Sequence, residues 1–293
     1  MKVLSSIVIG LLVVGCGEKN SPGPQVETPE TPKADVNETT APKAQPKEEA
    51  KNPEPPKTTT KKLIANPIVE KAIRRELKKP TGELTHRDFK KITELSLSNS
   101  LITDAGLKEL VKLQQLRQLR LSNTKITDLM LGELANLKNL TRLDLSTTKI
   151  SDVGLKELAK LHQLEWLWLG NIPITDAGLK EVAKLKKLSF IDLSYTKITD
   201  AGLKELVRLE KLDDLDLSGT KITDTGVKEA TNLRQLTSLS LCDTKITDAG
   251  VKELCKLKNL KVLYLLSCKI SDAEVTELHK ALPNCTIGFS VKE

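Results

Sequence analysis

Histidine and cysteine are scarce in this chain of 293 residues, and neither forms a recognisable catalytic or metal-binding pattern. The three histidines, His86, His162 and His279, lie far apart in the sequence. The sequence has no HExxH motif, nucleophile elbow or phosphate-binding loop, and its five cysteines lack metal or redox spacing. It therefore predicts no metal, no cofactor and no enzymatic activity.

Long hydrophobic runs are also missing, except at the N-terminus. The run from Val3 to Val14 is too short for a comfortable transmembrane helix but suits a signal-peptide core, so residues 1–15 are predicted to be a signal peptide. It ends in Val13-Val14-Gly15-Cys16, which resembles the bacterial lipoprotein box. The resemblance implies cleavage before Cys16, lipidation of that cysteine, and a protein anchored to a bacterial membrane. The outer membrane is favoured, with the protein in the periplasm or on the cell surface; the alternative is a plain secretory signal.

The segment after the signal peptide, residues 16–62, has almost no large apolar side chains and is rich in Pro, Glu, Thr and Lys. Such a segment cannot bury enough apolar surface to fold. It is therefore predicted to be a disordered tether that starts at the lipidated cysteine. As a random coil it would span roughly 40 Å.

A repeat of 24 residues fills most of the remaining chain. Lys125-Ile126-Thr127-Asp128 returns at constant spacing up to Lys269, and the first of eight copies starts at Leu101. In each copy apolar residues alternate as in a half-buried strand, a Ser/Thr-Asp pair offers side-chain oxygens to a helix start, and apolar residues at helical spacing follow. Each period is therefore predicted to hold a strand, a turn and a short helix, which bury their leucines only by stacking.

The second copy, Leu116-x-x-Leu119-x-Leu121-x-x-Thr124-x-Ile126, resembles the leucine-rich repeat, and the match covers about residues 92 to 287. The bacterial and ribonuclease-inhibitor-like subtypes are the most similar. The resemblance implies an α/β solenoid shaped like a horseshoe, with a parallel sheet on the concave face and short helices on the convex face. Residues 92–282 are predicted to form the eight repeats, and residues 283–293 a closing strand.

The repeats depart from the family at its Asn position, which holds Ser, Thr, Ile or Cys. A threonine hydroxyl there is expected to bond the backbone of the neighbouring turn. Ile172 cannot form such a bond and is followed by Pro173. The fourth repeat is therefore expected to have a locally different turn.

A helical N-terminal cap is predicted over residues 63–91. Apolar residues from Ile68 to Leu77 follow helical spacing, Pro80-Thr81-Gly82 breaks that helix, and Thr85 to Lys91 predicts a second short helix. The segment resembles the N-terminal cap of internalin-like bacterial repeat proteins. Such a cap is needed because the first repeat has no preceding neighbour to cover its leucines.

The formal net charge of +7 and pI of about 9 raise the question of nucleic-acid binding. Lysines and acids are interleaved in the predicted tether, so it is not a basic tail. On the predicted helices a Lys or Arg stands three residues after a Glu, which predicts ion pairs on the outer face: Glu109–Lys112, Glu157–Lys160, Glu181–Lys184, Glu205–Arg208, Glu253–Lys256 and Glu277–Lys280. The charge is interpreted as a solvated helix surface, and no nucleic-acid partner is predicted.

Side chains that flank the buried strand leucines are expected to point to the concave face. Five of the seven aromatic residues of the chain fall on or beside that face. Both tryptophans flank Leu167 and are expected to meet water, so their removal should hardly change folding stability. The candidate partner-binding residues are Arg120, Arg142, Asp144, Trp166, Trp168, Phe190, Asp192, Tyr195, Asp214, Asp216 and Tyr264.

These features predict a membrane-anchored leucine-rich-repeat module of the bacterial envelope that binds a protein or peptide through its concave face. The arginines precede the tryptophans and most aspartates follow them, so the partner is expected to carry an acidic end and a basic end. A glycan-binding module is the alternative, because aromatic faces beside Asp acceptors can hold sugar rings. A passive structural spacer is a third possibility, and a monomer is expected.

The four cysteines outside Cys16 are assigned by their place in the repeat. Cys255 and Cys268 are predicted to be small buried residues, Cys242 to lie on the inner face and Cys285 to begin the closing strand. An exported location would permit a disulfide between them, and the sequence leaves that open.

Overall fold

The computed structural model describes residues 62–290, here called the repeat domain. The predicted signal peptide, the predicted lipidation site Cys16 and the predicted tether up to residue 61 lie outside the described residues. No helix between residues 62 and 290 is long and apolar enough to cross a membrane.

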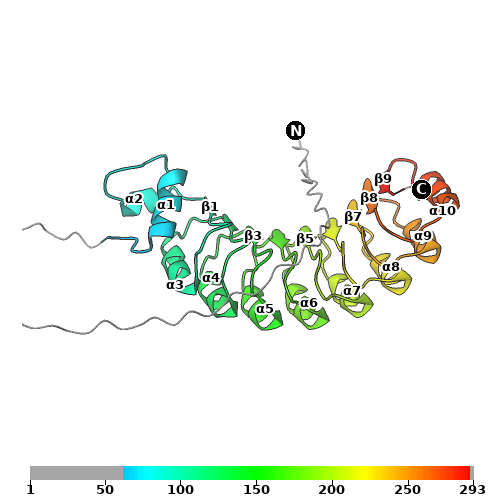
Figure 1. Cartoon of the computed structure of the whole chain (residues 1–293), viewed down its shortest axis with the longest axis horizontal. Helices are drawn as coiled ribbons and strands as arrows, with labels where there is room; N and C mark the ends of the chain where they lie inside the picture. Colours follow the sequence, from blue (N-terminus) through cyan, green and yellow to red (C-terminus); the bar gives the residue numbers. More distant parts are fainter. Residues whose placement is uncertain (1–61, 291–293) are drawn as a thin grey trace, which may run out of the picture. The chain divides into compact units, whose positions relative to one another are not determined.

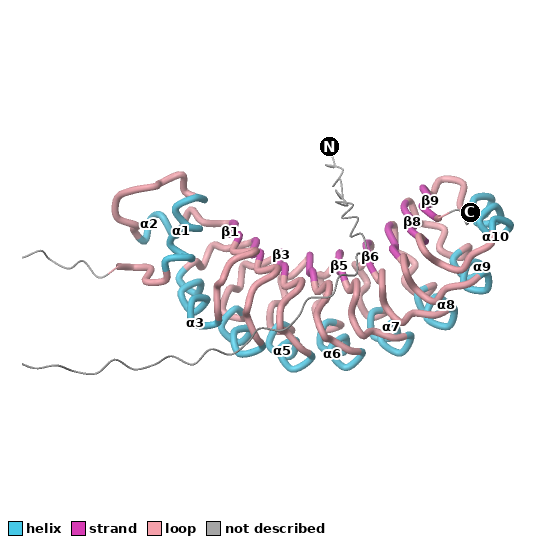
Figure 2. The backbone as a smooth tube through the Cα atoms, viewed as in Figure 1, coloured by secondary structure: helices cyan, strands magenta, loops and turns pink. Residues whose placement is uncertain are grey.

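Nine parallel strands form one sheet in which the spatial order equals the sequence order. Figures 1 and 2 show the strands on the inner side of the curved repeat domain and the helices on its outer side, which confirms the predicted horseshoe. Each strand pairs with its equivalent one repeat later, so equivalent side chains form columns across the sheet. The strands are β1 Glu94–Ser96, β2 Gln118–Arg120, β3 Arg142–Asp144, β4 Trp166–Trp168, β5 Phe190–Asp192, β6 Asp214–Asp216, β7 Ser238–Ser240, β8 Val262–Leu265 and β9 Thr286–Phe289.

The outer side carries one short helical segment per repeat. From the third repeat to the seventh this segment is a regular α-helix of seven residues, whereas the first two repeats combine an α-helical and a 3-10 turn. The segments are α3 Asp104–Leu107 with η1 Lys108–Lys112, η2 Asp128–Met130 with α4 Leu131–Leu134, α5 Asp152–Leu158, α6 Asp176–Val182, α7 Asp200–Leu206, α8 Asp224–Ala230, α9 Asp248–Leu254 and α10 Asp272–Ala281.

A continuous apolar core lies between sheet and helices. From β2 to β8 the leucine or isoleucine at the centre of the strand, such as Leu119, Leu143 or Leu167, has no exposed surface. Core residues from neighbouring repeats belong to one cluster that runs from the N-terminal cap to the closing strand. The leucines are therefore buried by stacking between repeats, as the sequence predicts.

The Ser/Thr-Asp pair has a second role that the sequence analysis did not predict. As expected, the Thr199 hydroxyl accepts a hydrogen bond from Ala201 N at the start of α7. The same Thr199 also donates to Asp176 of the preceding repeat, from its backbone N to Oδ1 (2.8 Å) and from its hydroxyl to Oδ2 (2.6 Å). Equivalent bonds join successive repeats through an aspartate ladder: Asp104, Asp128, Asp152, Asp176, Asp200, Asp224 and Asp248.

The glycine two residues after most ladder aspartates makes room for the aspartate of the preceding repeat. A Cβ atom on Gly202 would overlap Oδ1 of Asp176 and lie 2.9 Å from Cδ1 of Leu179. Met130 occupies this position in the second repeat. There the helical segment begins as the 3-10 turn η2 instead of a regular α-helix, because a side chain cannot approach the preceding repeat as closely as glycine does.

Gly202→Ala is therefore expected to lower the free energy of unfolding by about 2 kcal/mol, as overpacking of a dense interior does. Gly132→Ala is the matched control, since its added Cβ would meet only the Glu157 side chain, at 3.6 Å or more. Alanine has the higher helix propensity, so the control should be neutral or stabilising by up to about 1 kcal/mol. Denaturant unfolding of both variants measures the difference, and equal effects would contradict the proposed role of the ladder.

The threonines at the family's Asn position are buried and bond within their own turn. Thr196 Oγ1, for example, donates to Leu193 O at 2.6 Å. The expected bond to the neighbouring turn is therefore wrong: the hydroxyl lies close to its own backbone and reaches the carbonyl three residues earlier in the same repeat. The predicted change in the fourth repeat is confirmed, because Ile172 is buried and its carbonyl accepts from Ile174 N at 2.9 Å.

The N-terminal cap contains α1 Pro67–Glu76, which begins one residue before the predicted stretch, and α2 His86–Phe89, which lies within the second one. Asn66 caps α1 by accepting from Ile68 N and Val69 N, and Pro67 opens the helix. The cap is joined to the first repeat by hydrogen bonds from Ala65 N and Asn66 N to the Glu109 carboxylate.

The predicted ion pairs on the outer helices are all present, with N–O distances from 2.6 to 3.3 Å. The four cysteines of the repeat domain are free thiols. Cys285 is buried, but Cys255 and Cys268 are only half-buried, so the prediction that both are buried is wrong. Both pack against the edge of the core instead of within it.

Candidate functional site

The concave face displays two columns of side chains that flank the central strand leucines. In the first column Trp166 lies between Arg142 of β3 and Phe190 of β5. In the second column Trp168 lies between Asp144 and Asp192. Adjacent strands are roughly 4.8 Å apart, so these groups are close enough to interact directly.

Trp166, Trp168 and Phe190 pack together as an aromatic cluster. The rings of Trp166 and Phe190 are stacked, with centroids 5.1 Å apart and an interplanar angle of 21°. Trp168 contacts Phe190 at 4.9 Å and Trp166 at 5.8 Å in tilted arrangements. Three of the few rings in the chain are therefore gathered at one place on the concave face.

The packing of these rings corrects one expectation. Both tryptophans are half-buried, and Phe190 is only 7% exposed. The sequence register places all three rings on the concave face, but it does not show that they cover one another. They therefore contribute to stability as well as to the surface, because an aromatic pair is worth about 0.5–1.5 kcal/mol beyond its buried area.

The two candidate arginines differ in their surroundings. The Arg142 guanidinium carbon lies 5.0 Å from the ring centroid of Trp166, a cation–π contact that extends the aromatic cluster toward β3. Arg120 lies one strand further away, where the Gln118 amide oxygen accepts from its guanidinium. Arg142 therefore belongs to the centre of the site and Arg120 to its border.

Four aspartates border the aromatic cluster: Asp144 on β3, Asp192 on β5, and Asp214 and Asp216 on β6. Burial raises the pKa of Asp192 to about 6, with the nearby Asp216 and Asp144 carboxylates adding to the rise and hydrogen bonds from Ser194 opposing it. Burial also raises the pKa of Asp214 to about 6, where a hydrogen bond from Ser238 opposes the rise. The charge on this part of the face therefore changes over mildly acidic pH.

The two tyrosines of the predicted site lie outside the aromatic cluster. Tyr195 is in the turn after β5, with a φ of 54°, and is 60% exposed. Its ring lies against Gly219, where a Cβ atom would overlap it. Tyr264 is on β8, four strands from Trp168, and lies against Gly288 of β9. The structure thus brings together the candidates on β3 to β6 but not all eleven.

Two glycines that the sequence analysis did not single out shape this face. A Cβ atom on Gly170 would lie 2.8 Å from Asp192 Oδ2, so this glycine makes room for the Asp192 carboxylate. Gly219 likewise makes room for the Tyr195 ring, which a Cβ atom at this position would overlap. Both glycines could have been recognised by aligning the repeats. Gly170 stands where the neighbouring repeats have serine, as at Ser146, and Gly219 stands where most repeats have a polar turn residue.

Asp192→Asn should stabilise the protein by about 1 kcal/mol at pH 8. A pKa that rises from 3.8 to about 6 on folding corresponds to at most about 3 kcal/mol, and the half-buried group keeps part of its water. The folded state binds the proton more tightly, so wild-type stability falls as pH rises from about 4 to about 6. The stabilisation by Asp192→Asn should therefore vanish below pH 4. Urea unfolding of the variant and the wild type at pH 8 and below pH 4 measures this difference. Equal destabilisation at both would mean that the lost carboxylate hydrogen bond dominates.

The repeat domain contains no cluster of His, Cys, Asp and Glu side chains that could hold a metal ion. Its parallel solenoid and open concave face define a repeat protein of the leucine-rich class. The family model described as leucine-rich repeat region matches residues 150–287, and a second, for two leucine-rich repeats, matches residues 114–160. The chain belongs to the leucine-rich-repeat proteins.

Among solved structures, the chain is similar to internalin C2 from Listeria monocytogenes, with 28% sequence identity and a TM-score of 0.62. That match covers 78% of this chain and 95% of internalin C2. An internalin (inlF) of the same organism matches with 19% identity and a TM-score of 0.39, covering 78% and 92% of the two chains. No curated protein matches the chain.

Proposed function

We propose that this protein is a lipid-anchored binding module of the bacterial envelope that recognises a protein or peptide through its concave face. The observation that carries the proposal is the aromatic cluster on β4 and β5, with Arg142 beside Trp166 and an aspartate on each side of Trp168. Half-buried aromatic residues bordered by charged groups are typical of the centres of protein interfaces.

The surroundings of Trp168 favour a basic side chain as the central contact. Its neighbours in the second column are Asp144 and Asp192, so a carboxylate flanks the ring on each adjacent strand. An aromatic ring attracts a Lys or Arg side chain through its π face, and the carboxylates add charge complementarity. The partner would therefore present a Lys or Arg over Trp168 and an acidic group toward Arg142.

A glycan ligand is the competing function, since Trp residues beside aspartates also suit sugar rings. Stacking of a sugar needs an open ring face. Trp166 has Arg142 on the β3 side and Phe190 on the β5 side, both about 5 Å from its ring centroid. The Trp166 ring is therefore occupied by its own neighbours, which favours the peptide.

Peptide display against the protein that begins at Gly17 tests the proposal. We expect enrichment of peptides with a Lys or Arg followed or preceded by an acidic residue, and loss of this enrichment in Trp168→Ala. A glycan array run in parallel tests the competing function. Binding of a glycan that depends on Trp168, with no enriched peptide, would overturn the proposed partner class.

The anchoring part of the proposal depends on Cys16. Cys16→Ser should move the protein from the membrane fraction to the soluble fraction without changing the folding of the repeat domain, because the acylated thiol is the proposed anchor. Fractionation of cells followed by immunoblotting measures this change. A variant that stays in the detergent-soluble membrane fraction would contradict the lipid anchor and leave the concave-face proposal untouched.

A further inference from the structure

The positive charge of this protein is concentrated in its N-terminal cap. Residues 62–91 contain nine Lys or Arg and four Asp or Glu, so the cap accounts for +5 of the formal +7 of the whole chain. Residues 92–293, in contrast, contain 29 Lys or Arg and 27 Asp or Glu, so their charges nearly balance. The cap is thus a basic end on an otherwise nearly balanced solenoid.

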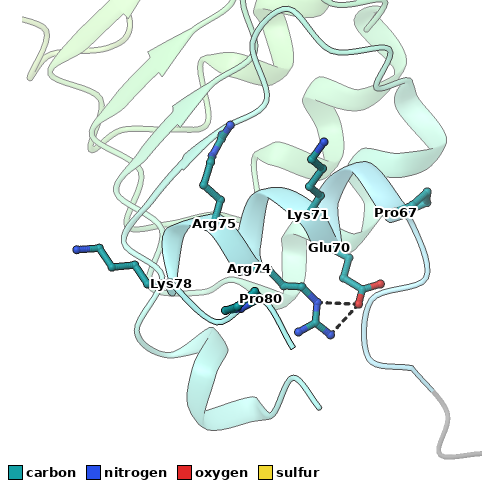
Figure 3. A pocket seen from close by; sticks show the side chains of 7 residues that line it. All are labelled: Pro67, Glu70, Lys71, Arg74, Arg75, Lys78 and Pro80. Atoms are coloured by element: carbon teal, nitrogen blue, oxygen red, sulfur yellow. Dashed lines mark hydrogen bonds and ion pairs between the residues drawn. The ribbon is translucent and has the colours of Figure 1, made fainter. Parts of the chain in front are cut away.

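A groove of about 510 Å³ lies in this basic end, along helix α1 (Figure 3). Four basic side chains line it, together with Glu70 and two prolines: Lys71, Arg74, Arg75 and Lys78. Arg74 is paired with Glu70 at 2.9 Å, and Arg75 donates to Ser96 O at 2.8 Å. Lys71 and Lys78 are exposed and form no ion pair with any residue between 62 and 290.

The charges of the groove are therefore only partly satisfied by the protein itself. Glu70 is already shared between Arg74 and Lys62. Two free ammonium groups remain beside guanidinium groups that are held in place by their own hydrogen bonds. Phosphate oxygens are the natural acceptors for such a combination, with Arg as a directional donor and Lys as a point charge.

We propose that the cap groove docks the repeat domain onto an anionic membrane surface through the phosphates of lipid headgroups. The chain enters the repeat domain at Lys62, beside this groove. An anchor at Cys16 would therefore be connected to the basic end of the solenoid and not to its opposite end. Contact through the cap leaves the concave face of β3 to β6 free for its partner.

The magnitude of this attraction follows from general membrane electrostatics. Each Lys or Arg near an anionic bilayer surface strengthens binding by about fivefold, and the effect falls off within a Debye length of about 8 Å at physiological salt. Glu70 offsets one of the four basic groups that line the groove, and the remaining three together strengthen binding by about a hundredfold. The contact should also weaken strongly as salt is added.

The protein that begins at Gly17 tests the proposal, because it lacks the anchoring cysteine but contains the whole repeat domain. We expect it to sediment with phosphatidylglycerol-containing vesicles and not with pure phosphatidylcholine vesicles, and to be released by salt. Lys71→Glu combined with Lys78→Glu should weaken this binding at least tenfold. The matched control is Lys221→Glu with Lys245→Glu, which makes the same change of charge at exposed repeat positions and should change binding by less than about threefold.

Three outcomes would overturn the proposal. The first is an equal loss of binding in the two double variants, which would show a dependence on net charge alone. The second is equal binding to both kinds of vesicle. The third is the absence of vesicle binding by the unaltered protein. Peptide binding by the same variants is a separate readout. Because the altered lysines lie at the β1 end of the sheet and not on strands β3 to β6, retained peptide binding with lost vesicle binding distinguishes this proposal from the proposed function.

Discussion

Trp168→Ala is expected to weaken binding of the peptide partner by about thirtyfold or more. Removing an anchoring aromatic residue at the centre of an interface typically costs on the order of 2 kcal/mol or more. Trp168 is half-buried, lies between Asp144 and Asp192 on the adjacent strands, and contacts Phe190 at a centroid distance of 4.9 Å. Titration calorimetry with an enriched peptide measures the loss.

The same variant should remain folded but become less stable by about 1 kcal/mol, since it loses two ring contacts. Trp166→Ala should lower stability more, by about 2 kcal/mol, because Trp166 is covered by both Arg142 and Phe190. The sequence alone predicts nearly no change for either tryptophan, so these unfolding measurements decide between exposed rings and a packed cluster.

Tyr264→Ala provides the matched control on the same concave face. Tyr264 is four strands away from Trp168 and makes no contact with the aromatic cluster. The peptide affinity of this variant should stay within about threefold of the wild type, as expected for residues outside the centre of an interface. A larger loss for Tyr264→Ala than for Trp168→Ala would place the binding centre at the C-terminal end of the sheet instead.

Acid should weaken the same interaction. The carboxyl groups of Asp192 and Asp214 have pKa values of about 6, so both are mostly ionised at pH 7.5 and mostly protonated at pH 5. A cationic partner prefers the ionised form, and its affinity should therefore fall several-fold over this range. Asp192→Asn would remove part of this dependence.

The period of the repeat is sufficient to predict the architecture. A strand, a turn and a helix must fit into 24 residues, and constant spacing without insertions brings equivalent positions into register. The concave columns follow from the alternation around residues such as Leu143 and Leu167, which are fully buried as predicted. Local patterns of this kind depend on backbone geometry and are readable from sequence.

Contacts between repeats are harder to predict, because they depend on how side chains lean once the repeats are stacked. The bonds between Asp176 and Thr199 join residues 23 positions apart, and the sequence analysis did not predict them. The related feature in the sequence is Gly202, which makes room for the Asp176 carboxylate. Phe190 is buried by its neighbours for the same reason. The net charge of the whole chain does not reveal the basic cap, because it does not show that +5 of the +7 falls within residues 62–91.

Removal of the N-terminal cap is expected to have the largest effect on solubility. A protein that begins at Ser96 should aggregate, whereas one that begins at Leu63 should be monomeric and unfold cooperatively. Ile73 and Phe89 are buried in the core, while Ile68 and Leu77 pack against it from half-buried positions. Without them, the leucines of the first repeat would form an exposed apolar patch at one end of the solenoid.

A point substitution separates loss of the cap from loss of chain length. Ile73→Ala removes a side chain with no exposed surface and should lower stability by about 3 kcal/mol, within the range for buried isoleucine. Lys71→Ala changes an exposed residue of the same helix and should stay within about 0.5 kcal/mol of the wild type. Size-exclusion chromatography and thermal unfolding provide both readouts. If the protein that begins at Ser96 is monomeric and melts at the wild-type temperature, residues 63–91 do not act as a cap.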